Sequence, residues 1–438
     1  MQSNTADLRN KRVTVAGLGR FGGGIEVSRW LALQGAKVLV TDKESAAKLA
    51  DSVEKLRGLP IYFRLGEHRT SDFTDCDLVV TSPAIPPTNE YLKAAVSAGV
   101  PVSTEIRLFI ERCPARIIGV TGTKGKSTTS TLLGLMLKKR FTTWVGGNIG
   151  GSLLEKLPEF KPSDLVVLEL SSYMLEHLRP AKWSPHVAVV TMITRDHTEW
   201  HDGFDNYVDS KKNIVRFQSQ NDFSVLNQHD PMSTGFAKEA GGQVVFYGTE
   251  NCPLFKLKLW GDHNQLNAQA AFTAANLFGV SWEEAQTAIA DFAGLPHRLQ
   301  LVHEINGVKY YNDSIATIPE AAIAALGSFP EKHVIQIVGG YDKHLPLSEM
   351  CSALARRAKA VLCIGATGPS IANAVKLAGG SNPPAIYECG DLETAVKKAR
   401  HLVTTGDIVL LSTGCASYDQ FANFESRGDA FTRLAKQA

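Results

Sequence analysis

The sequence predicts an α/β protein built from three consecutive α/β domains. Short runs rich in Val, Ile and Leu alternate with helical patterns, which is typical of parallel sheets covered by helices on both faces. The same alternation restarts late in the chain, near residue 333. The length of 438 residues is consistent with roughly three domains of about 150 residues each.

The composition indicates an ordinary globular protein. Hydrophobic residues make up 44% and charged residues 21% of the chain, a balance that allows a buried core without covalent cross-links. A net charge of +2 lacks the basic excess of nucleic-acid-binding proteins. The polar first dozen residues and the lack of a long apolar run argue against a signal peptide and a membrane span. We expect a cytoplasmic monomer that binds small molecules, with no nucleic acid or membrane as partner.

Apolar runs followed by helical patterns are the predicted strands. In chain order they are VTVAG at 13–17, KVLVTD at 37–42, DLVVTS at 77–82, RIIGVTG at 116–122, DLVVLEL at 164–170, VAVVTMI at 187–193, HVIQIVGG at 333–340, AVLCIGAT at 360–367 and DIVLLST at 407–413. Breaks are predicted at the Cys113–Pro114 junction and at the turn that ends in Pro296, because the residue before proline resists the helical conformation. The predicted domains are residues 1–112, 113–295 and 296–438.

The first strand runs into a GxGxxG turn at 17–22, and Asp42 ends the next strand. Glycines let the backbone approach a diphosphate, a helix N-terminus offers free N–H groups to it, and the acidic residue can accept hydrogen bonds from ribose hydroxyls. The alternative is a tight turn that selects glycine for packing. The pattern indicates a nucleotide site and leaves the nucleotide open.

A stronger motif, TGTKGKSTT, occupies residues 121–129 between a predicted strand and a helical pattern. The N–H groups of such a loop can surround a phosphate chain, Lys126 would neutralise the β- and γ-phosphates, and Ser127 would hold Mg²⁺ through its hydroxyl. Val120 stands where the full phosphate-loop pattern has its first glycine. We predict ATP as the ligand. The predicted ATP-binding residues of the loop are Gly122, Thr123, Lys124, Gly125, Lys126, Ser127 and Thr128.

Two more strands end in side chains that suit a metal. Glu169 lies at the carboxyl end of its strand, where open α/β sheets bind ligands. His197, which follows another strand, could bring a neutral imidazole nitrogen to the same ion. The alternatives are a solvated acid and a structural histidine. No base-reading NKxD segment is present, which disfavours a regulatory GTPase.

In their order along the chain, the motifs resemble those of the Mur ligases. They are TGTKGKST, GGNIG at 146–150, LELSS at 168–172, DH at 196–197, HN at 263–264, PHR at 296–298 and NDS at 312–314. The SPAIP segment at 82–86 and the long segment at 410–431 resemble the glutamate-adding members of this family. The resemblance extends over essentially the whole chain.

The resemblance implies an ATP-dependent amide ligase of cytoplasmic peptidoglycan precursor synthesis. It would join UDP-N-acetylmuramoyl-L-alanine to D-glutamate through an acyl phosphate, with ATP and two Mg²⁺ ions as cofactors. The three domains would be a Rossmann-like UDP-binding domain, a P-loop ATPase-like central domain and a Rossmann-like C-terminal domain that binds glutamate. The glycine-rich turn would then hold UDP.

The resemblance also implies a role for individual residues. Ser127 and Glu169 would hold the first Mg²⁺ and His197 the second, while Lys211 would be carbamylated, an anionic form that two metal ions favour. The implied catalytic residues are Lys126, Lys211, His197 and Glu169. The implied UDP-substrate contacts are Gly19, Arg20, Phe21, Asp42, Lys43, Ser82, Asn148 and Ser172. Further ATP contacts would be Asn264, Asn267, Arg298 and Asp313, and glutamate contacts would be Thr317, Lys343, Ser417 and Phe424.

One departure concerns the amino acid. The family segment reads NDSKAT, whereas this chain has Ile315 in place of the lysine, so L-glutamate stays an alternative to D-glutamate, which we favour. Another Mur or folylpolyglutamate-type amide ligase is a second alternative, although the DNPR segment of the diaminopimelate-adding enzymes is absent. A dinucleotide-sensing protein with a degenerate phosphate loop is a third.

Overall fold

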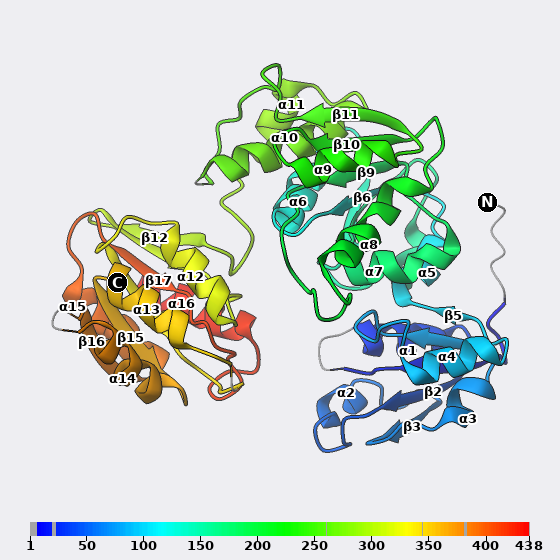
Figure 1. Ribbon diagram of the computed structural model, residues 1–438, viewed down its shortest axis with the longest axis horizontal. Coiled ribbons are helices and arrows are strands. Elements are labelled where there is room, and N and C mark those ends of the chain that lie inside the picture. Colours follow the sequence, from blue (N-terminus) through cyan, green and yellow to red (C-terminus); the bar gives the residue numbers. More distant parts are fainter. Residues whose placement is uncertain (1–6, 20–22, 260, 344, 381–382, 438) are drawn as a thin grey trace. The chain divides into compact units, whose positions relative to one another are not determined.

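Three mainly parallel sheets, each flanked by helices, form the chain (Figure 1). The computed structural model describes residues 7–19, 23–259, 261–343, 345–380 and 383–437. Contacts divide the chain into two compact units. The first holds residues 1–257 and 262–290, and the second holds residues 258–261 and 291–438. The predicted α/β architecture is confirmed, while the domain limits after residues 112 and 295 stay predictions.

The first sheet is fully parallel, with the strand order β3-β2-β1-β4-β5. Its strands are β1 (Arg12–Ala16), β2 (Lys37–Asp42), β3 (Ile61–Leu65), β4 (Leu78–Thr81) and β5 (Val102–Ser103). Its helices are α1 (Gly23–Leu33), α2 (Ala50–Glu54), α3 (Thr70–Thr74), α4 (Glu90–Ser97) and α5 (Glu105–Ile110). The order reverses between β1 and β4, and such a switch point opens a crevice at the carboxyl ends of the strands.

The second sheet is also parallel, in the order β11-β10-β9-β6-β8-β7. Its strands are β6 (Arg116–Thr121), β7 (Thr143–Gly147), β8 (Leu165–Glu169), β9 (Val187–Val190), β10 (Phe223–Asn227) and β11 (Gln243–Tyr247). Its α-helices are α6 (Lys126–Leu137), α7 (Ser172–Leu178), α8 (Phe204–Arg216), α9 (Pro231–Gly235), α10 (Asp262–Asn276) and α11 (Trp282–Ile289). The buried strands β6, β8 and β9 are continuous apolar runs because both faces are covered.

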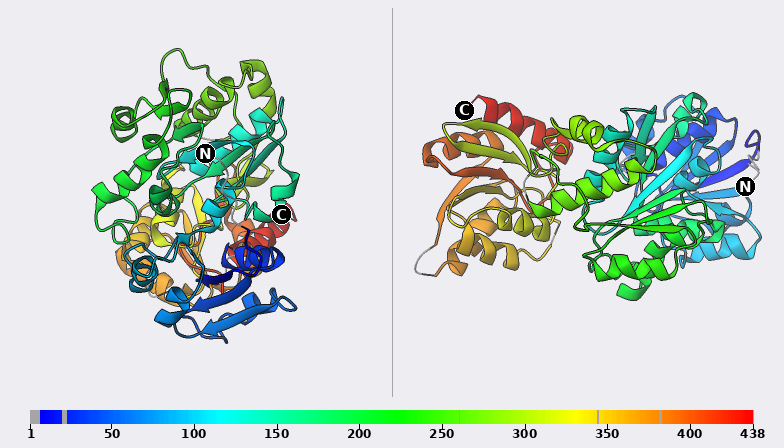
Figure 2. Two further views of the ribbon diagram at one scale, coloured as in Figure 1. Left: turned by 90° about the vertical axis from the view of Figure 1, so that its right-hand side faces the viewer. Right: turned by 90° about the horizontal axis from the view of Figure 1, so that it is seen from above.

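The third sheet has the order β12-β13-β17-β14-β15-β16, in which β12 runs antiparallel to β13. Its strands are β12 (Gln300–Ile305), β13 (Val308–Asn312), β14 (Val334–Val338), β15 (Ala360–Ile364), β16 (Ala385–Gly390) and β17 (Ile408–Leu411). Its helices are α12 (Pro319–Gly327), α13 (Ser348–Arg357), α14 (Gly368–Ala378), α15 (Leu392–Leu402) and α16 (Phe424–Lys436). Helices α12 to α14 pack on one face and α15 and α16 on the other, which gives two separate cores (Figure 2).

The predicted strands coincide with β1, β2, β4, β6, β8, β9, β14, β15 and β17. Several predicted strands ran one to three residues too far at the carboxyl end, into the loops that carry the polar residues. Among the described helices, none combines the length and the apolar content needed to cross a bilayer.

A glycine sets the distance between α6 and the sheet. A Cβ atom on Gly134 would lie 2.5 Å from Cγ2 of Val145 on β7. We expect Gly134→Ala to lower the free energy of unfolding by about 1–3 kcal/mol, because an extra methyl group in a packed interior forces its neighbours to shift. Thermal unfolding of the two proteins measures the difference.

Gly235, the last residue of α9, is the matched control. Its φ of −59° is helical and a Cβ there would meet nothing within 4 Å. Gly235→Ala should leave the stability unchanged or raise it by up to about 1 kcal/mol, since alanine restricts the unfolded chain. Equal stabilisation by both substitutions would show that α6 does not need a glycine at position 134.

Candidate active site

Loops at the carboxyl ends of β1, β2 and β4 carry the candidate UDP-substrate residues of the first sheet. Gly17 has a φ of +90°, and a Cβ on it would lie 3.0 Å from Cβ of Ser82. The two loops therefore approach each other at a glycine. Gly19 belongs to the same turn, while Arg20 and Phe21 lie outside the described residues.

Asp42 holds the glycine-rich turn from the end of β2. Its Oδ2 accepts hydrogen bonds from the backbone N–H groups of Leu18 at 2.9 Å and Gly19 at 3.2 Å. Its Oδ1 accepts one from Glu44 at 2.9 Å. The carboxylate thus orders the turn, which is a different use from the ribose contact expected from the motif. The adjacent Lys43 has its Nζ 5.7 Å from the centre of the Tyr91 ring.

The phosphate loop between β6 and α6 is shaped by two glycines with positive φ. Gly122 has a φ of +146°, and a Cβ there would lie 1.9 Å from Oγ1 of Thr191. Gly125, which caps α6, has a φ of +87°, and a Cβ atom added to it would lie 2.4 Å from Oδ1 of Asn267. The loop therefore fits closely between the segment after β9 and helix α10, and larger residues at these positions would displace it.

The phosphate loop leads into α6 and carries a lysine at the start of that helix. The backbone N–H groups of Thr123 and Lys124 donate to the carbonyl oxygen of Met192 at 2.6 and 3.4 Å. Nζ of Lys126 donates to the carbonyl oxygen of Thr123 at 2.9 Å, which folds the side chain back over the loop. Ser127 is buried in the first turn of α6, and Thr128 follows it. Lys124 is exposed, and its carbonyl accepts a hydrogen bond from Thr191 at 2.7 Å. A helix N-terminus with a neighbouring cation is suited to a phosphate chain.

Glu169, at the end of β8, is the most deeply buried acid of the site, with an exposed fraction of 1%. Its Oε1 accepts a hydrogen bond from Nδ2 of Asn148 at 2.9 Å. Its Oε2 is buried and has no hydrogen-bond partner among the residues that the structure describes. An unpartnered buried carboxylate oxygen is unfavourable in an otherwise dry site. It suits a metal ligand, because Mg²⁺ prefers oxygen donors.

Lys211 reaches the phosphate loop from α8 and is 1% exposed. Its Nζ donates to the carbonyl oxygen of Gly122 at 2.9 Å and to Oγ1 of Thr121 at 3.4 Å, and lies 4.8 Å from the centre of the Tyr207 ring. Burial, and then the nearby charge of Lys126, holds the pKa of Lys211 well below its ordinary value. The amine is therefore a candidate for the neutral, nucleophilic form.

His197 follows β9 and has a φ of +49°, an uncommon conformation for a residue other than glycine. Burial lowers the pKa of His197, and the charges of Lys126 and Lys124 lower it further, while the Asp196 carboxylate opposes them. The imidazole is consequently neutral near pH 7, the form that binds metals. Its ring lies 4.9 Å from that of Tyr173. The described His, Cys, Asp and Glu residues alone form no group of three that could hold a metal, so a site here needs the hydroxyl or the lysine.

A hydrogen-bond chain behind this site was not predicted from the sequence. Nε2 of His201 lies 2.9 Å from Oγ of Ser172, and its Nδ1 lies 3.1 Å from Oγ of Ser210. Ser210 also donates to Oε2 of Glu176 at 2.8 Å. Burial lowers the pKa of His201 to about 4. Ser172 therefore has a neutral imidazole as its partner, and the only sequence signal for His201 was its position four residues after His197.

The remaining ATP-site candidates lie in two places. Asn264 and Asn267 are one turn apart on α10, and Nδ2 of Asn267 donates to Oδ1 of Asn264 at 3.1 Å. Asp313 and Arg298 belong to the second unit. Asp313 accepts hydrogen bonds from Ser412 at 2.7 Å and from the N–H of Leu299 at 3.0 Å, and burial raises its pKa to about 6.

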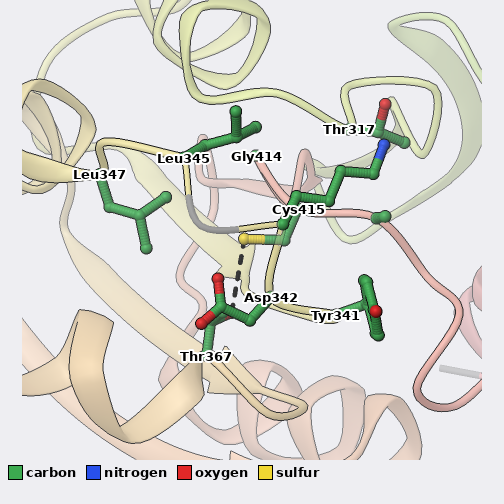
Figure 3. Close-up of a pocket in the computed structure, with 10 residues that line it drawn as sticks. Thr317, Tyr341, Asp342, Leu345, Leu347, Thr367, Gly414 and Cys415 are labelled. Atoms are coloured by element: carbon green, nitrogen blue, oxygen red, sulfur yellow. Dashed lines mark hydrogen bonds between the residues drawn. The ribbon is translucent and has the colours of Figure 1, made fainter.

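A pocket in the second unit is lined by two of the four candidate amino-acid residues (Figure 3). Thr317 and Lys343 line it, together with Tyr341, Asp342, Leu345, Leu347, Thr367, Gly414, Cys415 and Ala416. Ser417 follows directly in sequence, and its buried Oγ has no hydrogen-bond partner within the described ranges. Phe424 begins α16 and its carbonyl accepts a hydrogen bond from Ser314 at 2.8 Å. The four candidates therefore belong to loops and a helix end of one domain.

Known protein families correspond to each of the three sheets. A MurD-like N-terminal domain of Mur ligases matches residues 11–104, a Mur ligase middle domain matches 120–253, and a Mur ligase glutamate ligase domain matches 297–415. A UDP-N-acetylmuramoylalanine–D-glutamate ligase of Roseiflexus sp. is 41% identical over 466 residues, which cover 98% of this chain and 99% of that protein. The chain belongs to the Mur ligase family.

Other Mur ligases are similar to this chain in length and fold. The UDP-N-acetylmuramoylalanine–D-glutamate ligase of Acetivibrio thermocellus is 38% identical, with 98% of this Mur ligase and 96% of that protein covered. The crystal structure of a UDP-N-acetylmuramate-alanine ligase from Thermotoga maritima matches with a TM-score of 0.59 at 20% identity, over 98% of this chain and 99% of that one. The MurF ligase of the same organism, in complex with ADP, has a TM-score of 0.57 at 18% identity, over 99% and 97%.

His201 makes the stability of this Mur ligase depend on pH. Its folded-state pKa of about 4 lies below the ordinary value of 6.5, so the unfolded chain binds a proton between these pH values that the folded protein does not. The contribution of His201 to stability is therefore complete above pH 6.5 and falls as the pH drops towards 4.

The free energy of unfolding of the parent and of His201→Gln, measured across this pH range, tests the assignment. The difference in unfolding free energy, parent minus variant, should decrease steadily with falling pH, because only the parent carries the imidazole of His201. Acids such as Asp313 titrate in both proteins, so their contribution cancels in the difference. Two parallel pH curves would contradict the buried neutral imidazole.

Proposed function

We propose that this Mur ligase joins D-glutamate to UDP-N-acetylmuramoyl-L-alanine in the cytoplasm, with ATP hydrolysed to ADP and phosphate. The observation that carries the proposal is the phosphate loop beside the half-satisfied carboxylate of Glu169, in a chain that aligns over 98% of its length with ligases of that name. The names of these relatives also support D-glutamate over the L-glutamate alternative raised by Ile315.

The first step is transfer of the γ-phosphoryl group to the carboxylate of the alanine. An anion must approach another anion, and the repulsion is large in a site shielded from water. The loop N–H groups and Lys126 oppose it, because they place fixed positive charge where the phosphates lie. Mg²⁺ would add Lewis-acid polarisation of the phosphate oxygens, held by Ser127, Glu169, His197 and Lys211.

Lys211 would serve as a metal ligand after carbamylation. A neutral amine attacks CO₂, a nitrogen–carbon bond forms while one carbon–oxygen π bond breaks, and the released proton passes to solvent, so the neutral amine becomes an anionic carbamate. The burial of Lys211 and its depressed pKa support this chemistry. Among the described residues, Oε2 of Glu169 has no hydrogen-bond partner, which favours a bound cation nearby. Such a cation would stabilise the carbamate.

The second step is attack of the amine of glutamate on the acyl phosphate. A tetrahedral intermediate forms, and its collapse releases phosphate and leaves the amide. Water must be excluded from the acyl phosphate for the amide to form. Thr317, Lys343, Ser417 and Phe424 would bind the amino acid, and Lys343 with the hydroxyl groups would supply donors for its carboxylates.

The other candidates would position the two nucleotides. Asp42 orders the turn that carries Gly19, which supports a ligand site at this turn. Asn148, which is bonded to Glu169, and Ser172, which is bonded to His201, lie at the ends of β7 and β8 and would contact the muramoyl part. Further UDP contacts would be Arg20, Phe21, Lys43 and Ser82, and further ATP contacts would be Asn264, Asn267, Arg298 and Asp313.

Phosphate release in the presence of ATP, Mg²⁺ and UDP-N-acetylmuramoyl-L-alanine tests the reaction. Release should depend on D-glutamate, while L-glutamate should give a rate close to that without amino acid. Lys126→Ala serves as the inactive control, since loss of one charge contact in the transition state lowers kcat by about 100-fold or more. Silence of the parent with both glutamate isomers, or NAD binding without ATP use, would refute the proposal.

Carbamylation is tested by removing the amine. Lys211→Ala should lower kcat by about 100-fold or more, as for loss of other electrostatic groups, and short-chain carboxylates should partly restore activity. Lys212→Ala is the matched control, because the Nζ of Lys212 pairs with Glu239 at 2.6 Å on the outer side of the same helix. Normal turnover by Lys211→Ala would exclude the carbamate.

A further inference from the structure

Arg427, in the second turn of α16, is a buried cation of the second unit. Only 1% of the residue is exposed. Its Nε donates to Oγ of Ser314 at 2.9 Å, one terminal nitrogen donates to the carbonyl of Ser314 at 2.9 Å, and the other donates to the carbonyl of Cys415 at 3.0 Å. All three acceptors are neutral oxygens. Within the described part of the chain, no carboxylate forms an ion pair with this guanidinium.

The guanidinium connects three loops at one edge of the third sheet. Ser314 follows β13, Cys415 follows β17, and a Cβ on Gly340, after β14, would lie 3.4 Å from Nη1 of Arg427. These three strands are neighbours in the sheet. The carboxyl ends of parallel strands are where open α/β sheets bind ligands. Arg427 therefore lies directly beneath the loops that form the amino-acid pocket.

Among the described residues, the charge of Arg427 is met by neutral hydrogen-bond acceptors and by no paired carboxylate. A buried charge is unfavourable unless an opposite charge or a full set of hydrogen bonds compensates it. Burial lowers the pKa of Arg427 to about 10, so the guanidinium stays protonated at neutral pH. Asp419 contributes some opposing charge, but one of its oxygens already accepts a hydrogen bond from the N–H of Ala366 at 2.9 Å. An anionic ligand in the pocket would complete the compensation.

The pocket offers further groups to such a ligand. Cys415, whose carbonyl accepts a hydrogen bond from Arg427, lines the pocket, and in Figure 3 a dashed line joins its sulfur to Thr367. The buried hydroxyl of Ser417 has no hydrogen-bond partner in the described part of the chain and can donate to a ligand. Lys343 is exposed at the rim, with its Nζ 5.8 Å from the centre of the Tyr418 ring. Asp342 also lines the pocket and suits the ammonium group of an amino acid. One acid with two cations fits an amino acid that carries two carboxylates.

We propose that Arg427 is a positioning and specificity-determining residue, whose buried charge fixes the loops at Ser314 and Cys415 and makes the pocket select a dicarboxylic amino acid over its neutral amide. This inference rests on the proposed ligase function and names the group that distinguishes glutamate from glutamine. Arg427 acts through the loops it holds and through its field, which is strong in a poorly hydrated interior.

Steady-state kinetics of Arg427→Gln and Arg427→Lys test this role. Arg427→Gln should raise KM for glutamate about tenfold or more, as for loss of a buried charge, and should reduce the preference for glutamate over glutamine by a similar factor. KM for ATP and for the UDP substrate should stay at the parental values. Arg427→Lys keeps the charge and should retain most of the preference.

Arg400→Gln is the matched control. Arg400 is a half-buried arginine of α15 that donates to the carbonyl of Leu434 on α16 at 2.6 Å. It anchors the same helix from outside the pocket. Its loss should lower the thermal stability and leave KM for glutamate unchanged, so the control separates loosening of α16 from loss of charge at the pocket.

The outcomes are distinct. A parental KM for glutamate in Arg427→Gln would overturn the proposal, as would an equal loss in both Arg427 variants accompanied by weaker ATP binding. If Arg427→Gln does not fold, the Nε–H resonance of Arg427 in the unmodified protein decides. It should shift on addition of glutamate and not of glutamine, and the absence of a glutamate-dependent shift would overturn the role. A parent that binds glutamate in this way but releases no phosphate would instead refute the ligase function.

Discussion

The functional regions depend on buried charged groups that no opposite charge in the described part of the chain neutralises. Among the described residues, Glu169 keeps one buried oxygen without a hydrogen-bond partner, and Arg427 buries a guanidinium among neutral acceptors. Each arrangement lowers the stability of the empty protein. Each becomes favourable once an ion or substrate of opposite charge is bound. The protein thus binds its ligands more tightly, and its empty form is less stable.

The strand order of each sheet determines where these groups lie. In the central sheet, β7, β8, β6 and β9 are neighbours and end in Asn148, Glu169, the phosphate loop and the His197 segment. In the third sheet, β13, β17 and β14 are neighbours, and the loops that follow them line the amino-acid pocket. Glycines at the strand ends allow the loops to come close, as Gly122 does against Thr191. Residues far apart in sequence thus meet because parallel strands end at one edge.

The sequence predicted the parts of this arrangement that are local. Strands such as β6 and β8 are apolar on both faces and were recognised, whereas β3 and β16 lie at sheet edges with partly exposed residues and β12 runs antiparallel, so their patterns were weak. The phosphate loop was predicted from its motif. His201 was missed because its partner Ser172 is 29 positions away. The bonds of Asp42 to the glycine-rich turn depend on the pairing of β1 with β2, which the sequence did not specify.

The order of strands in the third sheet bears on how the protein is synthesised. The last strand in the chain, β17, occupies the middle of the sheet between β13 and β14, and α16 follows it. A nascent chain that has emerged only as far as β16 therefore holds two half-sheets without the strand that joins them. This domain cannot complete its sheet until β17 has been synthesised, whereas every strand of the first two sheets is synthesised earlier. Removal of β17 and α16 would therefore take away the strand at the middle of the sheet.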